Sequence, residues 1–269
     1  MAPEPAPRGD PSPLEPAGPL VNPIVLMYHR VCADRDPRRG DFVVSASTFE
    51  RQMHWLAGHG FYAARHSEVL RLGGRAPRSP GRPVVLTFDD GYADNLEHAV
   101  PVLRKLGYPA ALFPVLDLGR RFNGWDALPE MRAPLLTVRE LREAEAAGLE
   151  LGSHTMSHPW LTRSTASELR DELVRSREVL ASVAVRPLPV LAYPYGDVDA
   201  RVKRAARAAG YLAGLAVNSG PLELRADPFE IRRQRVGNTA SGAYLRLLLS
   251  GGEKLFQWSK WRVRTGLAC

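Results

Sequence analysis

Short runs of apolar residues recur along the chain, and longer stretches of mixed apolar and polar residues separate them. Runs of this length, bounded by glycine, proline or charged residues, are typical of buried β-strands. The predicted strands are 23–28, 84–88, 110–116, 149–153, 189–195, 212–217 and 230–236.

Helices are predicted between these strands, because three of the intervening stretches begin with a capping box, a Ser or Thr followed three residues later by Glu. The predicted boxes are Ser47 with Glu50, Thr137 with Glu140, and Thr165 with Glu168. Further helices are predicted near 92–106 and 198–209. Pro101 should kink or break the first of these two helices.

Strands that alternate with helices predict βαβ crossovers and a parallel sheet. About seven such units in one chain of 269 residues favour a distorted or incomplete (β/α) barrel over an open doubly wound sheet. No glycine-rich phosphate loop follows the first predicted strand, which removes the usual support for nucleotide binding. The predicted fold class is therefore α/β, a barrel of about seven parallel strands.

The two ends of the chain differ in composition from its middle. Residues 1–22 are rich in proline and carry too few apolar residues to form a core, so a disordered tail is predicted there. Residues 23–240 hold the predicted barrel, and 241–269 are predicted to form a basic helical tail. Residues 231–264 contain eight basic residues and one acidic residue, so this segment alone accounts for the net charge of +7. Nucleic-acid binding over the whole surface is therefore disfavoured, whereas a local anionic contact near the C-terminal end fits the sequence.

Within that tail, residues 254–264 read KLFQWSKWRVR and place Leu255, Trp258 and Trp261 near one helical face with basic residues around it. This composition is typical of an interfacial membrane helix. The alternative is a final helix that packs across the barrel and keeps its charges in water.

Cysteine usage and the N-terminal residues bear on the cellular compartment. Two cysteines, Cys32 and Cys269, show no metal-type spacing, which fits a reducing cytoplasm. The first residues lack a positively charged start followed by an apolar core, so they do not predict a secretory signal. No run of about 18 apolar residues predicts a membrane span. We expect a cytoplasmic protein, with peripheral contact at the inner membrane face if 254–264 binds lipid.

Side chains suited to metal binding and proton transfer follow three of the predicted strands. Because loops at the carboxyl ends of barrel strands meet at one face, we expect these side chains to share a site. They are Asp89 and Asp90 after 84–88, His154 and His158 after 149–153, and His29 after 23–28.

The spacing of these residues indicates a metal. Neighbours on a regular strand point to opposite faces, so Asp89 and Asp90 are predicted to lie where the strand ends, with Gly91 allowing the turn. Two adjacent carboxylates need a nearby positive charge to stay ionised, and a divalent metal would supply it. His154 and His158 are four residues apart, which brings both imidazoles to one side if the chain turns helically there. Two imidazoles and one carboxylate with open positions are typical of a catalytic zinc site.

Three short motifs, TFDDG (87–91), SHTMSH (153–158) and AYPYG (192–196), resemble in this order those of the polysaccharide deacetylase family, also called the NodB homology domain or carbohydrate esterase family 4. The resemblance extends over residues 23–240. MYHRV (27–31) resembles more narrowly the poly-N-acetylglucosamine deacetylase branch, in which the acid histidine lies on the N-terminal strand. The resemblance implies a NodB-like barrel and a divalent metal, with zinc expected and cobalt as the alternative.

The resemblance also implies a role for each matching residue. The acid role requires His29 to be positively charged near neutral pH, which we expect beside carboxylates. The implied roles are a general base at Asp89, metal ligands at Asp90, His154 and His158, a general acid at His29, and an oxyanion-hole N–H at Tyr195 in a loop shaped by Pro194.

At one place the chain departs from the family pattern. Ala192 stands where many members carry an arginine that holds the base. Arg232 or Arg233 in the last predicted strand would fill that role, and only one of the two can face the site because strand neighbours point to opposite faces. Trp125 and Trp160 are candidates for sugar contacts, and packing is the alternative for both.

Together these observations predict a metal-dependent N-deacetylase that acts on an N-acetylated sugar in a polysaccharide or a glycan precursor, including a lipid-linked glycan. Two alternatives stay open. The same site would cleave an O-acetyl ester, and a protein of this fold without turnover would be a carbohydrate-binding protein.

Overall fold

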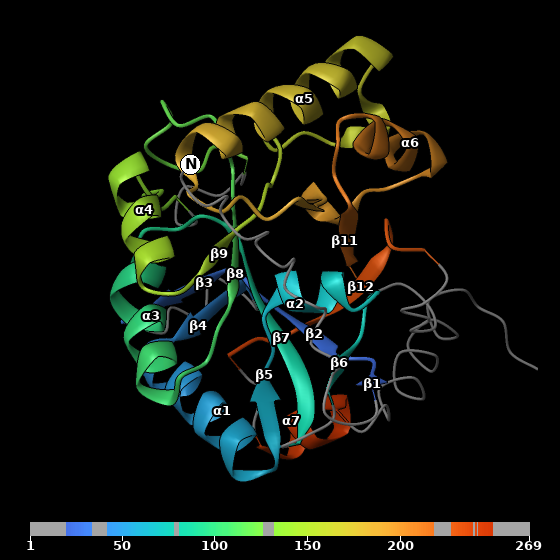
Figure 1. Ribbon diagram of the computed structural model, residues 1–269. Coiled ribbons are helices and arrows are strands. Elements are labelled where there is room, and N and C mark those ends of the chain that lie inside the picture. The colour runs from blue at the N-terminus through green and yellow to red at the C-terminus, as the bar shows by residue number, and fades with distance from the viewer. Residues whose placement is uncertain are drawn as a thin grey trace, which may run out of the picture.

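The computed structural model describes residues 20–33, 42–77, 81–125, 132–217, 227–238, 240 and 242–249. Its central feature is a parallel sheet with the strand order β10-β11-β12-β2-β7-β8-β9, to which β5 adds by pairing with β7 (Figure 1). The strands are β2 (Ile24–Tyr28), β5 (Phe61–Ala63), β7 (Arg82–Asp90), β8 (Ala111–Pro114), β9 (Glu150–Leu151), β10 (Val190–Ala192), β11 (Ala213–Val217) and β12 (Ile231–Arg235).

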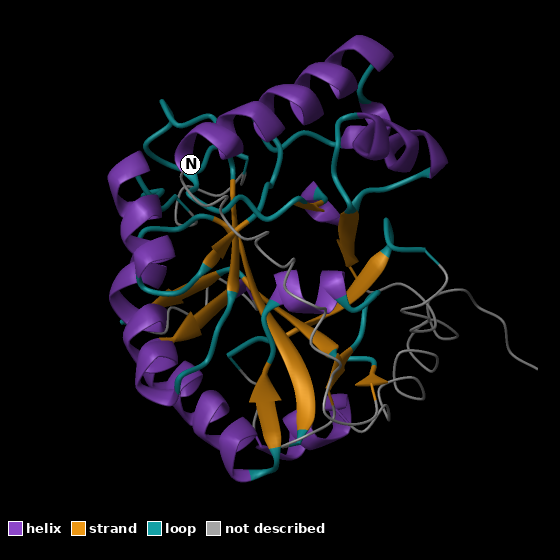
Figure 2. Ribbon diagram, viewed as in Figure 1, coloured by secondary structure: helices purple, strands orange, loops and turns teal. Residues whose placement is uncertain are grey.

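This sheet curls until the ends of its edge strands meet at one parallel bridge, between Ser153 and Leu191. Five helices follow one another around the outside of the curl (Figures 1 and 2). The seven strands of the main path thus form the distorted (β/α) barrel that the sequence predicts. The outer helices are α1 (Ala46–Gly58), α3 (Asp94–Leu106), α4 (Val138–Ala146), α5 (Ala166–Val183) and α6 (Ala200–Ala208).

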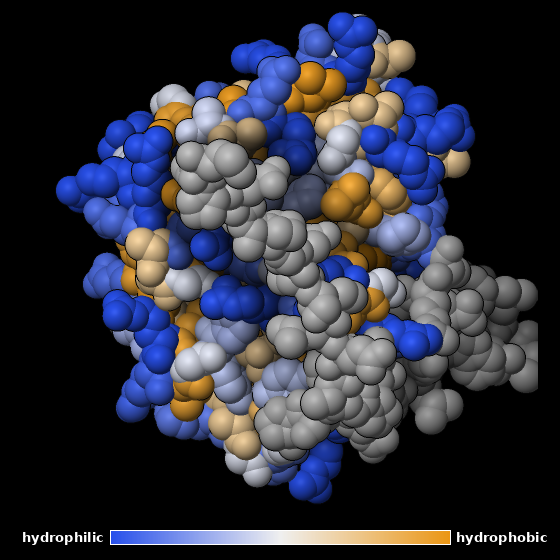
Figure 3. Space-filling model, in the orientation of Figure 1, coloured by the Kyte–Doolittle hydropathy of each residue, from blue (hydrophilic) through white to orange (hydrophobic). Residues whose placement is uncertain are grey.

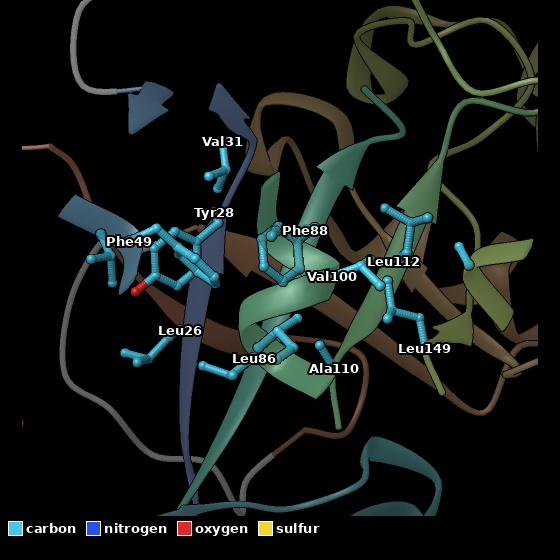
Figure 4. Close-up of a cluster of buried hydrophobic side chains, with 14 of the residues drawn as sticks. Leu26, Tyr28, Val31, Phe49, Leu86, Phe88, Val100, Ala110, Leu112 and Leu149 are labelled. Carbon is cyan, nitrogen blue, oxygen red and sulfur yellow. The ribbon is translucent and has the colours of Figure 1, made fainter. Parts of the chain in front are cut away.

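Alternate residues of the strands face two different cores. Tyr28 of β2 and Phe88 of β7 stack outside the barrel with ring centroids 5.4 Å apart, and Phe49 of α1 contacts both rings (Figure 4). Val25 and Val85, three residues earlier on each strand and therefore on its opposite face, belong to a separate inner cluster with α2 (His66–Arg71). The interior of the barrel is therefore a packed core over most of its depth.

Every predicted strand is confirmed, and so are the capping boxes that begin at Thr137 and Thr165. The predicted box at Ser47 is wrong. Helix α1 begins two residues earlier, where the extended Ser45 is the N-cap and its hydroxyl accepts a hydrogen bond from the Thr48 N–H. Ser45 ends the short strand β4 (Val43–Ser45), which the sequence analysis did not predict and which pairs with β3 (Arg30–Cys32).

Pro101 does not break α3, which runs without interruption from Asp94 to Leu106. Pro101 is exposed, where water can serve the carbonyl that its missing N–H leaves without a helical partner. Strand β5 and helix α2 were also not predicted, because three and six residues are too few for a periodic pattern.

At the N-terminal end, β1 (Leu20–Val21) pairs with β6 (Ala76–Pro77), so the predicted disordered tail is wrong for its residues 20 and 21. Residues 1–19 lie outside the described residues. At the other end, α7 (Gly242–Leu249) starts the predicted helical tail, whereas the predicted membrane segment 254–264 is outside the described residues. Among the helices that the structure describes, none is long and apolar enough to cross a membrane. Hydrophilic residues cover α4 and α6 at the periphery of the face in Figure 3.

Candidate active site

The two aspartates end the longest strand, as predicted. Asp89 follows Val85 and Thr87 on the inner face of β7, and it is 2 % exposed. Asp90 has a φ of 71°, which breaks the strand conformation at that residue. Gly91 continues the turn with a φ of 82°, and a Cβ there would lie 2.8 Å from the Pro114 Cβ. The backbone turn is thus what allows two consecutive carboxylates to serve one site.

His154 and His158 lie in the loop after β9, and the helical turn that we expected between them is wrong. Thr155 and His158 have φ angles of 67° and 66°, so the backbone leaves the right-handed helical conformation at both residues. The Ser153 hydroxyl accepts a hydrogen bond from the Thr155 N–H, and the Thr155 hydroxyl accepts one from the His158 N–H. These local bonds, rather than helical spacing, bring the two imidazoles to one side.

The loop is also fixed from outside by Glu172 of α5. Its carboxylate accepts hydrogen bonds from the N–H groups of Met156 and Ser157, at 2.9 and 3.0 Å, and from the Ser157 hydroxyl at 2.6 Å. Glu172 therefore holds the middle of the segment whose two ends carry the histidines.

Asp90, His154 and His158 form a buried cluster suited to a divalent metal. Asp90 Oδ1 lies 3.3 Å from His154 Nε2 and 3.4 Å from His158 Nε2, and it receives no hydrogen bond from the described residues. Across the cluster, the candidate ligand atoms all lie within 4.8 Å of one another. His154 Nδ1 is 2.7 Å from the Ala192 carbonyl oxygen, to which it donates as N–H, so Nε2 keeps its lone pair for a metal.

The electrostatics of this cluster agree with a cation site. Burial alone would raise the pKa of Asp90, but the adjacent histidines hold it well below the usual range. The carboxylate is thus ionised at neutral pH and lies beside two imidazole nitrogens, and one carboxylate with two imidazoles is the donor set of a catalytic zinc-type site. The residues present fit a divalent metal.

Asp89 is paired with Arg233 of β12, one of the two arginines that the sequence offered. Arg233 is fully buried and forms a two-pronged ion pair, with Nη1 at 2.7 Å from Oδ1 and Nη2 at 2.6 Å from Oδ2. Strand alternation selects it, because Arg232 points to the other face and pairs with Glu230 at 3.1 Å. Burial raises the pKa of Asp89, and the Arg233 guanidinium outweighs that effect and lowers it. Asp89 is therefore ionised at neutral pH.

His29 follows β2 and is half-buried near the aspartates. Asn95 of α3 fixes the backbone on both sides of it, because its Nδ2 donates to the His29 carbonyl at 2.7 Å and its Oδ1 accepts from the Val31 N–H at 2.9 Å. The Phe42 ring contacts the imidazole edge-on, with centroids 4.9 Å apart. Burial lowers the pKa of His29, and the neighbouring carboxylates offset this effect only in part. The structure thus lowers the pKa of His29, whereas the sequence led us to expect a positive charge near neutral pH.

Tyr195 lies in the short 3₁₀ segment Pro194–Gly196 and adopts a left-handed conformation, with φ 61° and ψ 2°. Pro194 is buried and begins this turn, in agreement with a shaping role. The Tyr195 ring contacts His158 with centroids 4.6 Å apart, and Trp125 stacks on His158 at 4.5 Å. Both residues thus adjoin the metal cluster.

Comparison with known proteins agrees with this geometry. A family model described as polysaccharide deacetylase matches residues 76–214, just over half of the chain. The chain belongs to the polysaccharide deacetylase family. The matched residues include Asp89, Asp90, His154, His158 and Tyr195, whereas His29 and Arg233 lie outside them.

Two members with curated descriptions are similar over most of the chain. The putative polysaccharide deacetylase YxkH of Bacillus subtilis is 26% identical over 226 residues, which are 82% of this chain and 75% of that protein. The poly-beta-1,6-N-acetyl-D-glucosamine N-deacetylase of Staphylococcus epidermidis is 26% identical over 239 residues, which are 81% of this chain and 80% of that protein.

Solved structures of deacetylases share the fold. The Streptococcus pyogenes deacetylase PplD in complex with acetate superposes with a TM-score of 0.72 at 23% identity, over 84% of this chain and 97% of the other. IcaB from Ammonifex degensii gives a TM-score of 0.69 at 22% identity, over 86% and 97%. The chain therefore has the NodB-like deacetylase fold.

The sequence did not predict two residues that support the site, Glu172 and Asn95. Each holds the backbone next to a candidate site residue. Neither lies in a motif, and each reaches the site from an outer helix through backbone hydrogen bonds. Ordinary helix residues of this kind carry no local signal, because their partners are set by how the helices pack on the barrel.

Proposed function

We propose that this deacetylase hydrolyses the N-acetyl amide of an N-acetylated sugar in a polysaccharide or glycan precursor and releases acetate. The observation that carries the proposal is the placement of an ionised, arginine-paired carboxylate directly beside a buried Asp-His-His cluster. Relatives of this chain from Staphylococcus aureus and Staphylococcus epidermidis bear the name poly-beta-1,6-N-acetyl-D-glucosamine N-deacetylase, which supports the sugar class.

A divalent metal bound by Asp90, His154 and His158 would polarise the acetyl carbonyl and lower the pKa of water. Zinc suits two imidazoles and one carboxylate, and cobalt is the alternative.

The residues of the chain supply the proton transfers. Asp89, held ionised by Arg233, accepts the proton of the attacking water. His29 donates a proton to the departing amine nitrogen, and its lowered pKa makes it a stronger acid at the cost of a smaller protonated fraction at neutral pH. The backbone N–H of Tyr195 donates to the oxygen that becomes negative in the tetrahedral intermediate. The products are acetate and a free amino sugar.

The test is acetate release from N-acetylglucosamine oligomers by chelator-stripped protein, with zinc or cobalt added back. We expect metal-dependent release in the wild type and a loss of about 10²- to 10⁴-fold in Asp89→Asn, because the general base is gone. The same variant should still bind one zinc ion, since Asp89 is not a ligand. Acetate release that survives Asp89→Asn unchanged would contradict the assignment of the base.

An O-acetyl esterase is the second candidate, because the same groups would cleave an ester more easily than an amide. Parallel assays on N-acetyl and O-acetyl sugars separate the two reactions. Zinc and glycan binding without any acetate release would instead support a carbohydrate-binding protein of the same fold.

Peripheral membrane contact through residues 254–264 stays a prediction, as does action on a lipid-linked glycan at the inner leaflet. Sedimentation with anionic liposomes at low salt tests the contact. Protein that stays in the supernatant under these conditions would contradict it.

A further inference from the structure

A continuous series of ring contacts, some stacked and one edge-on, runs from the protein surface to the metal cluster. The Arg163 guanidinium lies over the Trp160 ring at 4.7 Å, and Trp160 stacks on Tyr195 at 4.0 Å with an interplanar angle of 4°. Tyr195 meets His158 at 4.6 Å, and Trp125 stacks on His158 at 4.5 Å. We call these five residues the ring stack.

Trp160 is partly exposed, as a sugar-binding aromatic would be, but its ring already contacts other groups of the chain. The residue is 41% exposed. Its ring is nevertheless engaged by two groups of its own chain, a parallel phenol and a guanidinium. Sugar rings bind to an open aromatic face, so the arrangement favours an internal role for Trp160.

The internal role is explained by the backbone at Tyr195. A non-glycine residue with φ 61° is strained, and such residues persist only where surrounding contacts hold them. The Tyr195 side chain is 40% exposed, so burial does little to hold it. The Tyr195 ring contacts the rings of Trp160 and His158, and aromatic pairs of this kind contribute an energy of the same order as the strain.

His158 also requires contacts that hold its backbone conformation. It also has a positive φ, and its imidazole lies between the rings of Tyr195 and Trp125. A shift of Tyr195 would therefore reach the ligand nitrogen of His158 as well as the backbone N–H of Tyr195.

We propose that Trp160 is a positioning residue that holds Tyr195 in its left-handed conformation and, through the Tyr195 ring, orients the metal ligand His158. The proposal rests on the proposed function for its effect on turnover. Its effect on backbone order and on metal affinity does not depend on which substrate the enzyme uses.

The test compares Trp160→Ala with Trp160→Phe, which keeps an aromatic ring, and with Leu212→Ala, which removes an exposed apolar side chain remote in sequence from the ring stack. Zinc affinity by chelator competition and amide hydrogen exchange of residues 193–197 are measured on all four proteins. We expect Trp160→Ala to weaken zinc binding about tenfold and to speed exchange in that segment, because second-sphere groups of a metal ligand have effects of this size. Trp160→Phe and Leu212→Ala should stay within about threefold of wild type.

Turnover gives the discriminating second readout. In Trp160→Ala, we expect kcat for acetate release to fall about tenfold at saturating zinc while KM changes little, because the oxyanion donor is misplaced and sugar binding is not. A rise in KM with unchanged kcat and unchanged exchange would overturn the proposal and make Trp160 a sugar contact. If the wild type releases no acetate, the proposed function fails, whereas zinc affinity and hydrogen exchange still decide this proposal. If Trp160→Ala does not fold, Trp160→Leu is judged by the same criteria.

Discussion

Two parts of the site stabilise buried charge in different ways. We call Asp89 with Arg233 the proton side, and Asp90 with His154 and His158 the metal side. On the proton side, Asp89 is already neutralised by Arg233 and both groups come from regular strands. On the metal side, Asp90 faces the imidazoles of His154 and His158, and both Asp90 and His158 sit at left-handed backbone positions. One side is complete as folded, and the other side is shaped for a cation.

Under the proposed function, this difference separates the base, Asp89, from the metal ligand, Asp90. Without the Arg233 guanidinium, Asp89 would compete with Asp90 for the metal, because the two buried carboxylates belong to consecutive residues. The ion pair keeps Asp89 ionised and held away from ligation. The two sides should therefore respond differently to the same kind of change.

The largest expected effect is on the proton side. Arg233→Met should lower the free energy of unfolding of the metal-free protein by about 3–5 kcal/mol, because it leaves a buried carboxylate without its partner. Urea denaturation measures it. The control is Arg232→Met, which removes only a partly exposed pair with Glu230 and should cost less than about 1 kcal/mol. Equal losses in the two variants would remove the basis of the comparison.

The metal side should respond to metal instead. Zinc at about 100 times its dissociation constant should stabilise the wild type by about 2.7 kcal/mol, because it binds the folded state alone. Asp90→Asn should lose this gain, whereas Asp89→Asn should keep it. Denaturation with zinc and with chelator measures both. Stabilisation of Asp90→Asn to the wild-type extent would show that the metal binds elsewhere.

The third prediction concerns the support of the metal side. Glu172→Ala should weaken zinc affinity about 10- to 100-fold, since it frees the loop between the two histidine ligands. Glu178→Ala, an exposed glutamate on the same helix, is the matched control. Chelator competition gives both affinities, and identical values would mean that the loop holds its shape without Glu172.

The last prediction concerns how the free energy of unfolding depends on pH through His66, a buried residue of α2. Burial, helped by the Arg233 charge, lowers the pKa of His66 to about 4 from 6.5. A lowered folded-state pKa means that stability is complete above pH 6.5 and is lost as the pH falls toward 4. Between pH 7 and pH 5 the loss should be about 2 kcal/mol.

Denaturation of wild type and His66→Leu at both pH values measures this contribution. The variant should lose about 2 kcal/mol less than the wild type over that interval. His54→Leu, on an exposed position of α1, should keep the wild-type dependence. A His66→Leu protein with the full loss would assign the pH dependence to other groups.

Much of this architecture was predictable because it follows from short-range patterns. Apolar runs located the seven strands, and the alternation of strand residues limited the partner of Asp89 to one of two arginines. The spacing of His154 and His158 gave the right pair for the wrong reason, because left-handed turns rather than a helix bring the rings together. Spacing alone does not distinguish these two backbone paths.

The remaining features depend on contacts between distant segments. Glu172 and Asn95 reach the site only after α5 and α3 have packed on the barrel, and nothing in their neighbours marks them. The pKa of His29 also depends on contacts between distant segments. The sequence motifs suggested a positive charge beside carboxylates, whereas partial burial, a property of the whole fold, lowers the pKa of His29.

Every described non-glycine residue with a positive φ lies in this site, and they are Asp90, Thr155, His158 and Tyr195. Glycine is the residue that relieves such a conformation, so each position offers an easy gain in heat tolerance. A laboratory evolution experiment that scores only survival at high temperature would therefore enrich glycine where the metal ligands and the ring stack now stand. The selected protein would be more stable but would lack the residues of the site. Any engineering of this protein must therefore score activity in every round.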